Sequence, residues 1–181
     1  MSDRAADFIG SIPAFYDQGL GPIFFTEFAD DIARRVAVSV PSPVLEIAAG
    51  TGIVTRRLRD LLPSEAQLIA TDLNPPMLEV ARGKFRPDEK VEFQPADATA
   101  LPFPDASIDA IVCQFGVMFF PDKDKGNREA HRVLVGGGRY LFSVWDSHRH
   151  NPIGRLMTEI LTGLFPRDPP QFYQVPFAPS T

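Results

Sequence analysis

The stretch from Val44 to Gly52, VLEIAAGTG, constrains the fold of this chain more than any other segment. An apolar run ends in an acid and then opens into a glycine turn. Gly50 and Gly52 can adopt backbone angles that a side chain would forbid, and without a Cβ they let a bulky group lie against the peptide plane. Apolar residues then recur at roughly helical spacing, at Ile53, Val54, Leu58, Leu61 and Leu62. The pattern predicts a buried strand, a turn that a ligand can approach, and an amphipathic helix, as in nucleotide-type sites.

A second apolar run, residues 68–72, also ends in a carboxylate, Asp72. The carboxyl ends of neighbouring parallel strands lie side by side, so we expect Asp72 beside the glycine turn. An ionised Asp can accept hydrogen bonds from both hydroxyls of a ribose. The two features together predict a site for a ligand that carries a nucleoside.

The residues around the turn favour one class of such ligands. The dinucleotide fingerprint has a third glycine where this chain has Thr55, and a phosphate loop needs a lysine that does not follow Gly52. Glu46 would add negative charge where a pyrophosphate should rest, yet it suits a ligand with an ammonium group. S-adenosyl-L-methionine (AdoMet) has an ammonium group, a ribose and no phosphate, so the pattern points away from NAD.

Several ordered segments resemble class I AdoMet-dependent methyltransferases of the small-molecule type, similar to domains of ubiquinone and menaquinone biosynthesis enzymes. They are residues 44–52, 71–74, 96–98 with 101–103, and 129–134 before the glycines 136–138. The resemblance spans about residues 14–147 and departs from the family at Ala48, where glycine is more common. It implies methyl transfer by in-line displacement, for which the protein holds two reactants in line and excludes water.

The resemblance also implies roles for individual residues. Glu46 and the turn would lie against the methionine part and the ribose, Leu73 and Met77 would flank the adenine, and Asp97 would accept a hydrogen bond from the adenine amino group. Asp97 as a cap of a turn is the alternative. The expected cofactor-binding residues are Glu46, Ala48, Gly50, Thr51, Gly52, Asp72, Leu73, Met77, Asp97, Ala98 and Gln114.

Fewer residues are candidates for contact with the methyl acceptor. Tyr16, Phe119 and His148 are the expected ones, although aromatic residues are more often part of a core. Cys113 lies in an apolar run and is interpreted as a buried structural thiol rather than a nucleophile. No catalytic residue is assigned, since a methyl group already activated by positive charge needs no catalytic triad. No metal is expected.

Composition and charge narrow the function further. The 181 residues are 44% hydrophobic, which suits one sizeable core, and the net charge of −5 argues against a nucleic-acid surface. Arg56, Arg57 and Arg59 form the densest basic cluster, interpreted as a solvated helix face. No apolar run approaches the ~20 residues of a membrane span, and one cysteine allows no internal disulfide. We expect a cytoplasmic enzyme with a small-molecule acceptor.

Alternating elements predict an α/β fold with a doubly wound, mainly parallel sheet. The expected strands are residues 44–48, 68–72, 91–94, 108–113 and 138–145, with an apolar helical stripe at 25–36 before them and a helix at 153–164 after them. We assign residues 1–165 to a methyltransferase domain, with a helical cap at 1–40 and a cofactor-binding core at 41–147. Residues 166–181 hold five prolines and are expected to form an extended arm.

The resembling family completes its sheet with two more strands, which this sequence does not supply. Either the chain is a fragment of a longer protein, which we favour, or it is a short form that protects its sheet edge by self-association. The alternatives to a methyltransferase are a non-catalytic AdoMet-binding or interaction module and an NAD-dependent oxidoreductase.

Overall fold

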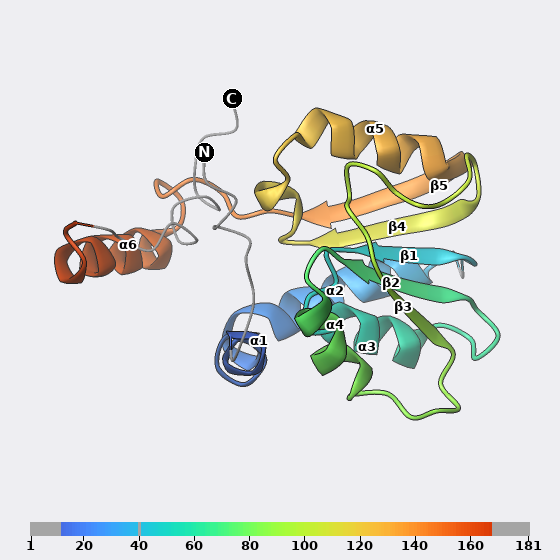
Figure 1. The fold of residues 1–181 in the computed structure, drawn as a ribbon, viewed down its shortest axis with the longest axis horizontal. Coiled ribbons are helices and arrows are strands. Elements are labelled where there is room, and N and C mark those ends of the chain that lie inside the picture. The colour runs from blue at the N-terminus through green and yellow to red at the C-terminus, as the bar shows by residue number, and fades with distance from the viewer. Residues whose placement is uncertain (1–11, 40, 168–181) are drawn as a thin grey trace.

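The protein folds around a five-stranded parallel sheet in the order β3–β2–β1–β4–β5 (Figure 1). The computed structural model describes residues 12–39 and 41–167. The strands are β1 (Val44–Ile47), β2 (Leu68–Asp72), β3 (Val91–Pro95), β4 (Ile108–Gln114) and β5 (Leu134–Ser143). β1 lies at the centre of the sheet. The chain adds β2 and β3 on one side of β1 and then β4 and β5 on the other, so the strand order reverses at β1. Such a reversal opens a crevice at the carboxyl ends of the strands, where ligands bind in open α/β sheets.

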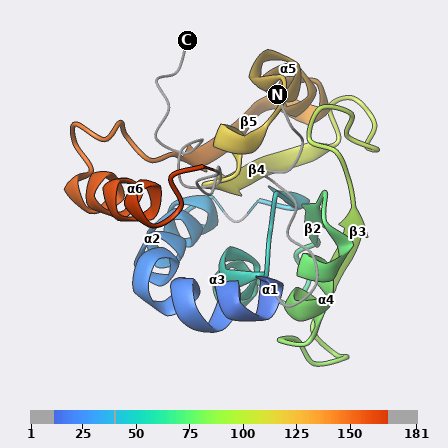
Figure 2. The same cartoon turned by 60° about the vertical axis from the view of Figure 1, so that its left-hand side comes forward.

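Helices cover both faces of the sheet (Figures 1 and 2). They are α1 (Ile12–Phe15), the π-helix η2 (Tyr16–Phe25), α2 (Thr26–Ala37), α3 (Ile53–Leu61), α4 (Pro75–Arg82), the 3₁₀ turn η3 (Val117–Phe119), α5 (Lys123–Val133) and α6 (Pro152–Leu164). Side chains alternate between the faces of each strand. Val44 and Leu68 therefore pack with α2 and α3, whereas Leu45 and Ile111 pack with α5 on the other face. The predicted doubly wound fold is confirmed.

The first four predicted strands lie within one residue of their observed bounds, but the fifth begins four residues earlier than predicted. β5 starts at Leu134, directly after α5, and its register against β4 shifts between Ile108 and Ala110. Gly137, at φ +82°, lies in this irregular stretch. A glycine in the left-handed region is typical of a β-bulge, so the triple glycine lies within the strand rather than ahead of it.

The helix α6 extends away from the rest of the fold (Figure 1). It was predicted at residues 153–164, but none of its residues is buried. The predicted C-terminal arm, residues 166–181, lies outside the described residues except for its first two. Within residues 12–39 and 41–167, no helix is long and apolar enough to cross a bilayer.

The N-terminal helical run differs from its prediction in two ways. The stripe predicted from residue 25 begins the helix α2 at Thr26, and the preceding ten residues form the π-helix η2. π-Helical turns are rare in proteins, and those that occur are frequently found at functional sites. Phe28, assigned to the apolar stripe, is 46% exposed, and its ring makes T-shaped contacts with the rings of Phe115 and Trp145.

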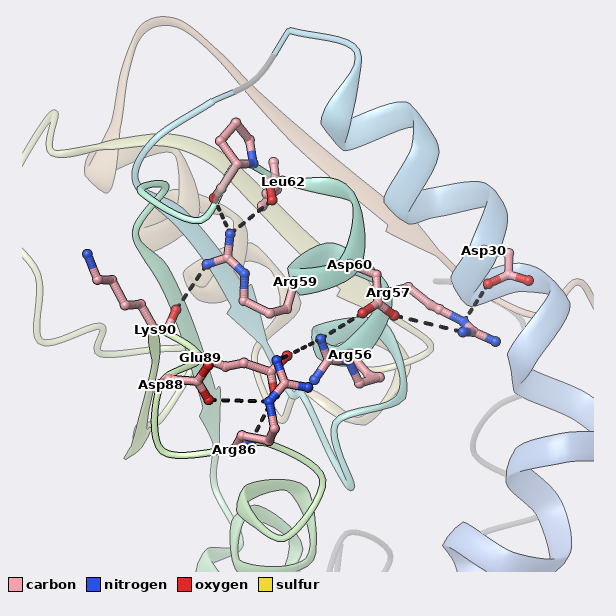
Figure 3. Close-up of polar contacts among 11 residues, drawn as sticks. Asp30, Arg56, Arg57, Arg59, Asp60, Leu62, Arg86, Asp88, Glu89 and Lys90 are labelled. Atoms are coloured by element: carbon pink, nitrogen blue, oxygen red, sulfur yellow. Dashed lines mark hydrogen bonds and ion pairs between the residues drawn. The ribbon is translucent and has the colours of Figure 1, made fainter.

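Arg59 corrects the interpretation of the basic cluster as a solvated face (Figure 3). Its side chain is buried, and its guanidinium donates to the carbonyl oxygens of Ala66 at 2.9 Å and Leu62 at 3.1 Å, and to those of Pro63 and Lys90. From the last turn of α3, Arg59 thus satisfies the carbonyl groups of the C-cap residue and of the loop that follows, as well as that of Lys90 just before β3. Buried carbonyl groups need such partners.

We expect Arg59→Met to lower the free energy of unfolding by about 2 kcal/mol, because the buried carbonyl groups lose a charged donor while the apolar stem remains. Arg57→Met is the matched control, since Arg57 pairs with Asp30 at a half-exposed site. Its loss should change stability by less than about 0.5 kcal/mol. Urea denaturation followed by circular dichroism measures both, and equal effects would contradict the role given to Arg59.

Candidate functional site

The turn after β1 has a strained backbone. Ala48, Gly50 and Gly52 have φ values of +54°, +56° and +78°. The backbone N–H of Ala49 donates to the carbonyl oxygen of Thr71 at 2.9 Å, so the turn remains attached to β2 as it leaves the sheet. Left-handed backbone costs little for glycine and more for alanine. The predicted turn therefore forms with alanine at position 48, which takes an unfavourable backbone angle.

Asp72 lies beside this turn, as predicted from the strand order. Its Oδ2 accepts a hydrogen bond from the backbone N–H of Gly50 at 2.8 Å. Its Oδ1 accepts from the backbone N–H of Asn74 at 2.8 Å and from the Asn74 side chain at 3.2 Å. Burial raises the pKa of Asp72 above its ordinary value, and the backbone donors of Asn74 and Gly50 oppose that rise. The tips of β1 and β2 thus form one hydrogen-bonded unit.

A cavity with an empty volume of about 330 Å³ opens above the turn. Its lining comes from the turn, from α3, from the end of β4 and from η2: Tyr16, Phe25, Glu46, Ala48, Ala49, Gly50, Thr51, Ile53, Val54 and Gln114. Thr51 Oγ1 and Gln114 Oε1, both in this lining, are two of the four buried side-chain atoms that lack a hydrogen-bond partner in the described part of the chain. Buried polar atoms are normally satisfied, so these two atoms suit a ligand.

Glu46 is the buried acid of the cavity. Thr55 Oγ1 donates to Glu46 Oε2 at 2.5 Å, and the side chain is otherwise enclosed. Burial raises the pKa of Glu46 to about 8, and nearby Asp72 adds to the rise, whereas the Thr55 hydrogen bond and the charge of Lys84 oppose it. A cation bound beside Glu46 would favour the ionised carboxylate.

Raising the pH should destabilise the wild-type protein relative to Glu46→Gln. Between the ordinary carboxyl pKa of about 4.5 and the native value of about 8, the native state keeps a proton that the unfolded chain releases. The stabilisation is complete below the lower value and is lost as the pH rises through the upper one. From pH 5 to pH 7 we expect the difference in unfolding free energy to shift by about 2 kcal/mol. Denaturation curves across this range test it, and a constant difference would show that Glu46 titrates normally.

Other predicted cofactor-binding residues lie beside the cavity rather than in its lining. Met77 lies under the turn, where a Cβ on Gly50 would come within 3.6 Å of its Cε. Leu73 is 61% exposed, and Ala98 is buried after β3. Asp97 Oδ1 accepts from the backbone N–H and the hydroxyl of Thr99, at 2.8 and 2.9 Å. One oxygen of Asp97 therefore caps a turn, as the alternative interpretation holds. The contact of Asp97 with adenine remains a prediction.

The three predicted acceptor residues do not lie together in the cavity. Tyr16 lines it, whereas Phe119 and His148 do not. His148 Nε2 lies 3.3 Å from Thr158 Oγ1 on α6, because the chain leaves the sheet after β5. Cys113 is buried, and burial raises the pKa of its thiol to about 12, which agrees with a structural thiol.

The sequence reasoning missed an aromatic wall beside the cavity. Phe25 lines the cavity and stacks on Tyr16, with ring centroids 5.1 Å apart. Phe115 lies 5.7 Å from Phe25 and stacks on Trp145 at 4.3 Å. Phe115 has a φ of +54°, which no pattern in the sequence predicts. The wall joins η2 to the ends of β4 and β5.

Comparison with known proteins places this geometry in a family. The methyltransferase domain family matches residues 45–142, more than half of the chain. The demethylmenaquinone methyltransferase of Thermus thermophilus is 42% identical over 114 residues, which are 60% of this chain and 51% of that protein. The ubiquinone/menaquinone biosynthesis C-methyltransferase UbiE of Shewanella frigidimarina is 33% identical over 155 residues, 82% of this chain and 62% of that protein.

Solved structures agree on the fold. The structure of the YcgJ protein from Bacillus subtilis has a TM-score of 0.58 at 26% identity, covering 75% of this chain and 58% of that one. A protein from Methanococcus maripaludis has a TM-score of 0.68 at 19% identity, covering 92% and 78%, a likeness that shows the fold alone. The chain spans about half the length of the curated Thermus relative. On the matched segment and the shared fold, the chain belongs to the methyltransferase domain family.

Proposed function

We propose that this chain is an AdoMet-dependent methyltransferase domain that acts on a small-molecule acceptor. The hydrogen bond between Asp72 Oδ2 and the Gly50 backbone carries the proposal, because it brings an anionic side chain and bare peptide together at one strand edge. The names of the Thermus and Shewanella relatives support quinone-like rings as the acceptor class.

The residues present suit AdoMet. Asp72 would bind the ribose hydroxyls, and the unpartnered oxygens of Thr51 and Gln114 offer hydrogen bonds inside the cavity. Glu46 would bind the ammonium group, whose charge would favour the ionised carboxylate. Leu73, Met77, Asp97 and Ala98 remain our proposal for the adenine side, with Gly52 and Ala48 shaping the turn. When bound, AdoMet supplies a methyl group already activated by a sulfonium charge.

The chain's own contribution is positioning and exclusion of water. Ile53 and Val54 from α3 and Phe25 from η2 present apolar surface to the cavity. Binding in a dry, shaped cavity holds two reactants in line, which accounts for a large part of the rate of such a transfer. No residue is assigned here as an acid or base.

A non-catalytic AdoMet-binding module and an NAD-dependent oxidoreductase remain the alternatives. Against the latter, Glu46 and Asp72 place two acids where a pyrophosphate would bring further negative charge. We also propose a cytoplasmic location, a methyltransferase domain at residues 1–165 and self-association through the open edge of β5. Phe142 and Val144 are about half exposed at that edge.

Transfer of a radiolabelled methyl group from AdoMet tests the enzyme against the module. The chain should be incubated with a panel of demethylated quinols, simple phenols and amines, alongside the full-length Thermus relative as a positive control. We expect label in at least one extractable quinol or phenol product. AdoMet binding without transfer to any acceptor that the control methylates would favour the module.

A further inference from the structure

The residues Ile12–Phe25, which comprise α1 and η2 and are called the flap here, lie over the cavity. Tyr16 and Phe25 are its two lining residues. Figure 2 shows α1 beside α4, the helix that follows Asp72. At the other end the flap continues into α2, and Gln114 Nε2 donates to the carbonyl oxygen of Phe25 at 3.2 Å. The flap thus joins β4 to α4 across the mouth of the site.

The flap is packed less tightly than the helix that follows it. Only Pro13 and Gly21 are buried within it, whereas α2 buries Ala29, Ile32, Ala33 and Val36. Segments with few buried contacts open at a lower free-energy cost than the core does. The flap can therefore move while α2 stays in place.

The carboxylate proposed to bind ribose is enclosed in the described structure. Asp72 is only 6% exposed. Tyr16 lines the cavity beside the turn that Asp72 holds, and burial, with the charge of Asp72 as a further cause, raises the pKa of its phenol. We expect the flap to open before a ribose hydroxyl reaches Asp72.

One ion pair joins the N-terminal half of the flap to the body of the domain. The Lys84 ammonium donates to Asp17 Oδ1, and both side chains are about three-quarters buried. Asp17 follows Tyr16 directly, and Lys84 lies two residues after α4. Partial burial makes such a pair stronger than an exposed one, because solvent screens it less.

We propose that the flap is a lid on the cofactor site and that the Asp17–Lys84 ion pair is its latch, which sets how fast the ligand enters and leaves. This inference rests on the proposed function. A latch that stabilises the closed form of both the empty and the filled protein slows binding and release together. The dissociation constant then changes little.

The test compares the binding kinetics of S-adenosylhomocysteine in four variants by stopped-flow fluorescence of Trp145, the single tryptophan, which stacks on the aromatic wall. Asp17→Asn and Lys84→Gln should each raise the association and dissociation rate constants about three- to tenfold, the range for loss of one partly buried pair. Lys84 also acts on Glu46, so the charge-reversed double variant Asp17→Lys/Lys84→Asp separates the latch from that effect. It should restore both rate constants to within about twofold of wild type.

Asp31→Asn is the matched control, because it breaks the exposed Arg35–Asp31 pair on α2 and should leave both rates unchanged. Hydrogen–deuterium exchange of the flap amides gives a second readout, and exchange should quicken in Asp17→Asn and Lys84→Gln alone. Unchanged rates and exchange in those variants, with normal affinity, would overturn the latch and leave the proposed function standing. A rise in the dissociation rate alone would also overturn it. Failure of the wild type to bind in calorimetry would overturn both proposals.

Discussion

Gly52→Ala should lower the free energy of unfolding by about 3 kcal/mol, through backbone strain and a clash together. Gly52 has a φ of +78°, and a Cβ added there would lie 2.8 Å from Ala81 Cβ and 3.2 Å from its Cα. The backbone of α4 cannot move away easily, because Met77, Leu78 and Ala81 are buried beneath the turn. Urea denaturation followed by circular dichroism measures the loss.

Gly50→Ala separates the two causes. Gly50 has a similar φ of +56°, but an added Cβ would make only an ordinary contact, 3.6 Å from Met77 Cε. We expect a loss of about 1 kcal/mol, the strain alone, which Ala48 already bears at φ +54°. If the two alanines destabilise the protein equally, the close approach of α4 to the turn does not contribute.

Asp72→Ala should weaken the binding of S-adenosylhomocysteine about 30- to 150-fold, or roughly 2 to 3 kcal/mol. Two effects add. The ligand loses charge-assisted hydrogen bonds, and the backbone N–H groups of Gly50 and Asn74 lose the carboxylate that holds the turn. Isothermal titration calorimetry gives the affinity, and thermal unfolding shows whether the variant is folded.

Asp60→Asn is the control for a lost carboxylate elsewhere in the fold. Asp60 pairs with Arg56 at 2.7 Å on the half-exposed end of α3, away from the cavity lining (Figure 3). Its affinity for the ligand should equal that of the wild type. Equal weakening in both variants would mean that the effect of Asp72 is indirect, and an unchanged affinity in Asp72→Ala would remove its proposed role.

The parts of the fold that could be predicted from sequence are those set by short-range pattern. Apolar runs that end in Glu46–Ile47 and in Asp72 gave β1 and β2, and parallel pairing then required their tips to meet. The start of β5 could not be predicted, because Gly137 allows a bulge that keeps a glycine-rich segment in the sheet. A triple glycine ordinarily indicates a loop.

The parts of the site that the sequence did not indicate depend on contacts between distant segments. Phe25 had the spacing of a core residue, and only the π-helix turns it toward the cavity. Arg59 looked solvated among its charged neighbours, but its guanidinium reaches carbonyl oxygens up to 31 residues away. His148 follows β5 and was expected at the site, yet the chain turns there toward α6. The spacing of apolar residues along the chain does not encode where these side chains point.

The central claim is that the tips of β1 and β2 jointly bind an adenosine that carries a methionine group. Calorimetric titration of the wild-type chain with S-adenosylhomocysteine and, separately, with NADH tests it most directly. The account predicts saturable binding of S-adenosylhomocysteine at one site per chain and no binding of NADH. Binding of NADH alone would contradict it.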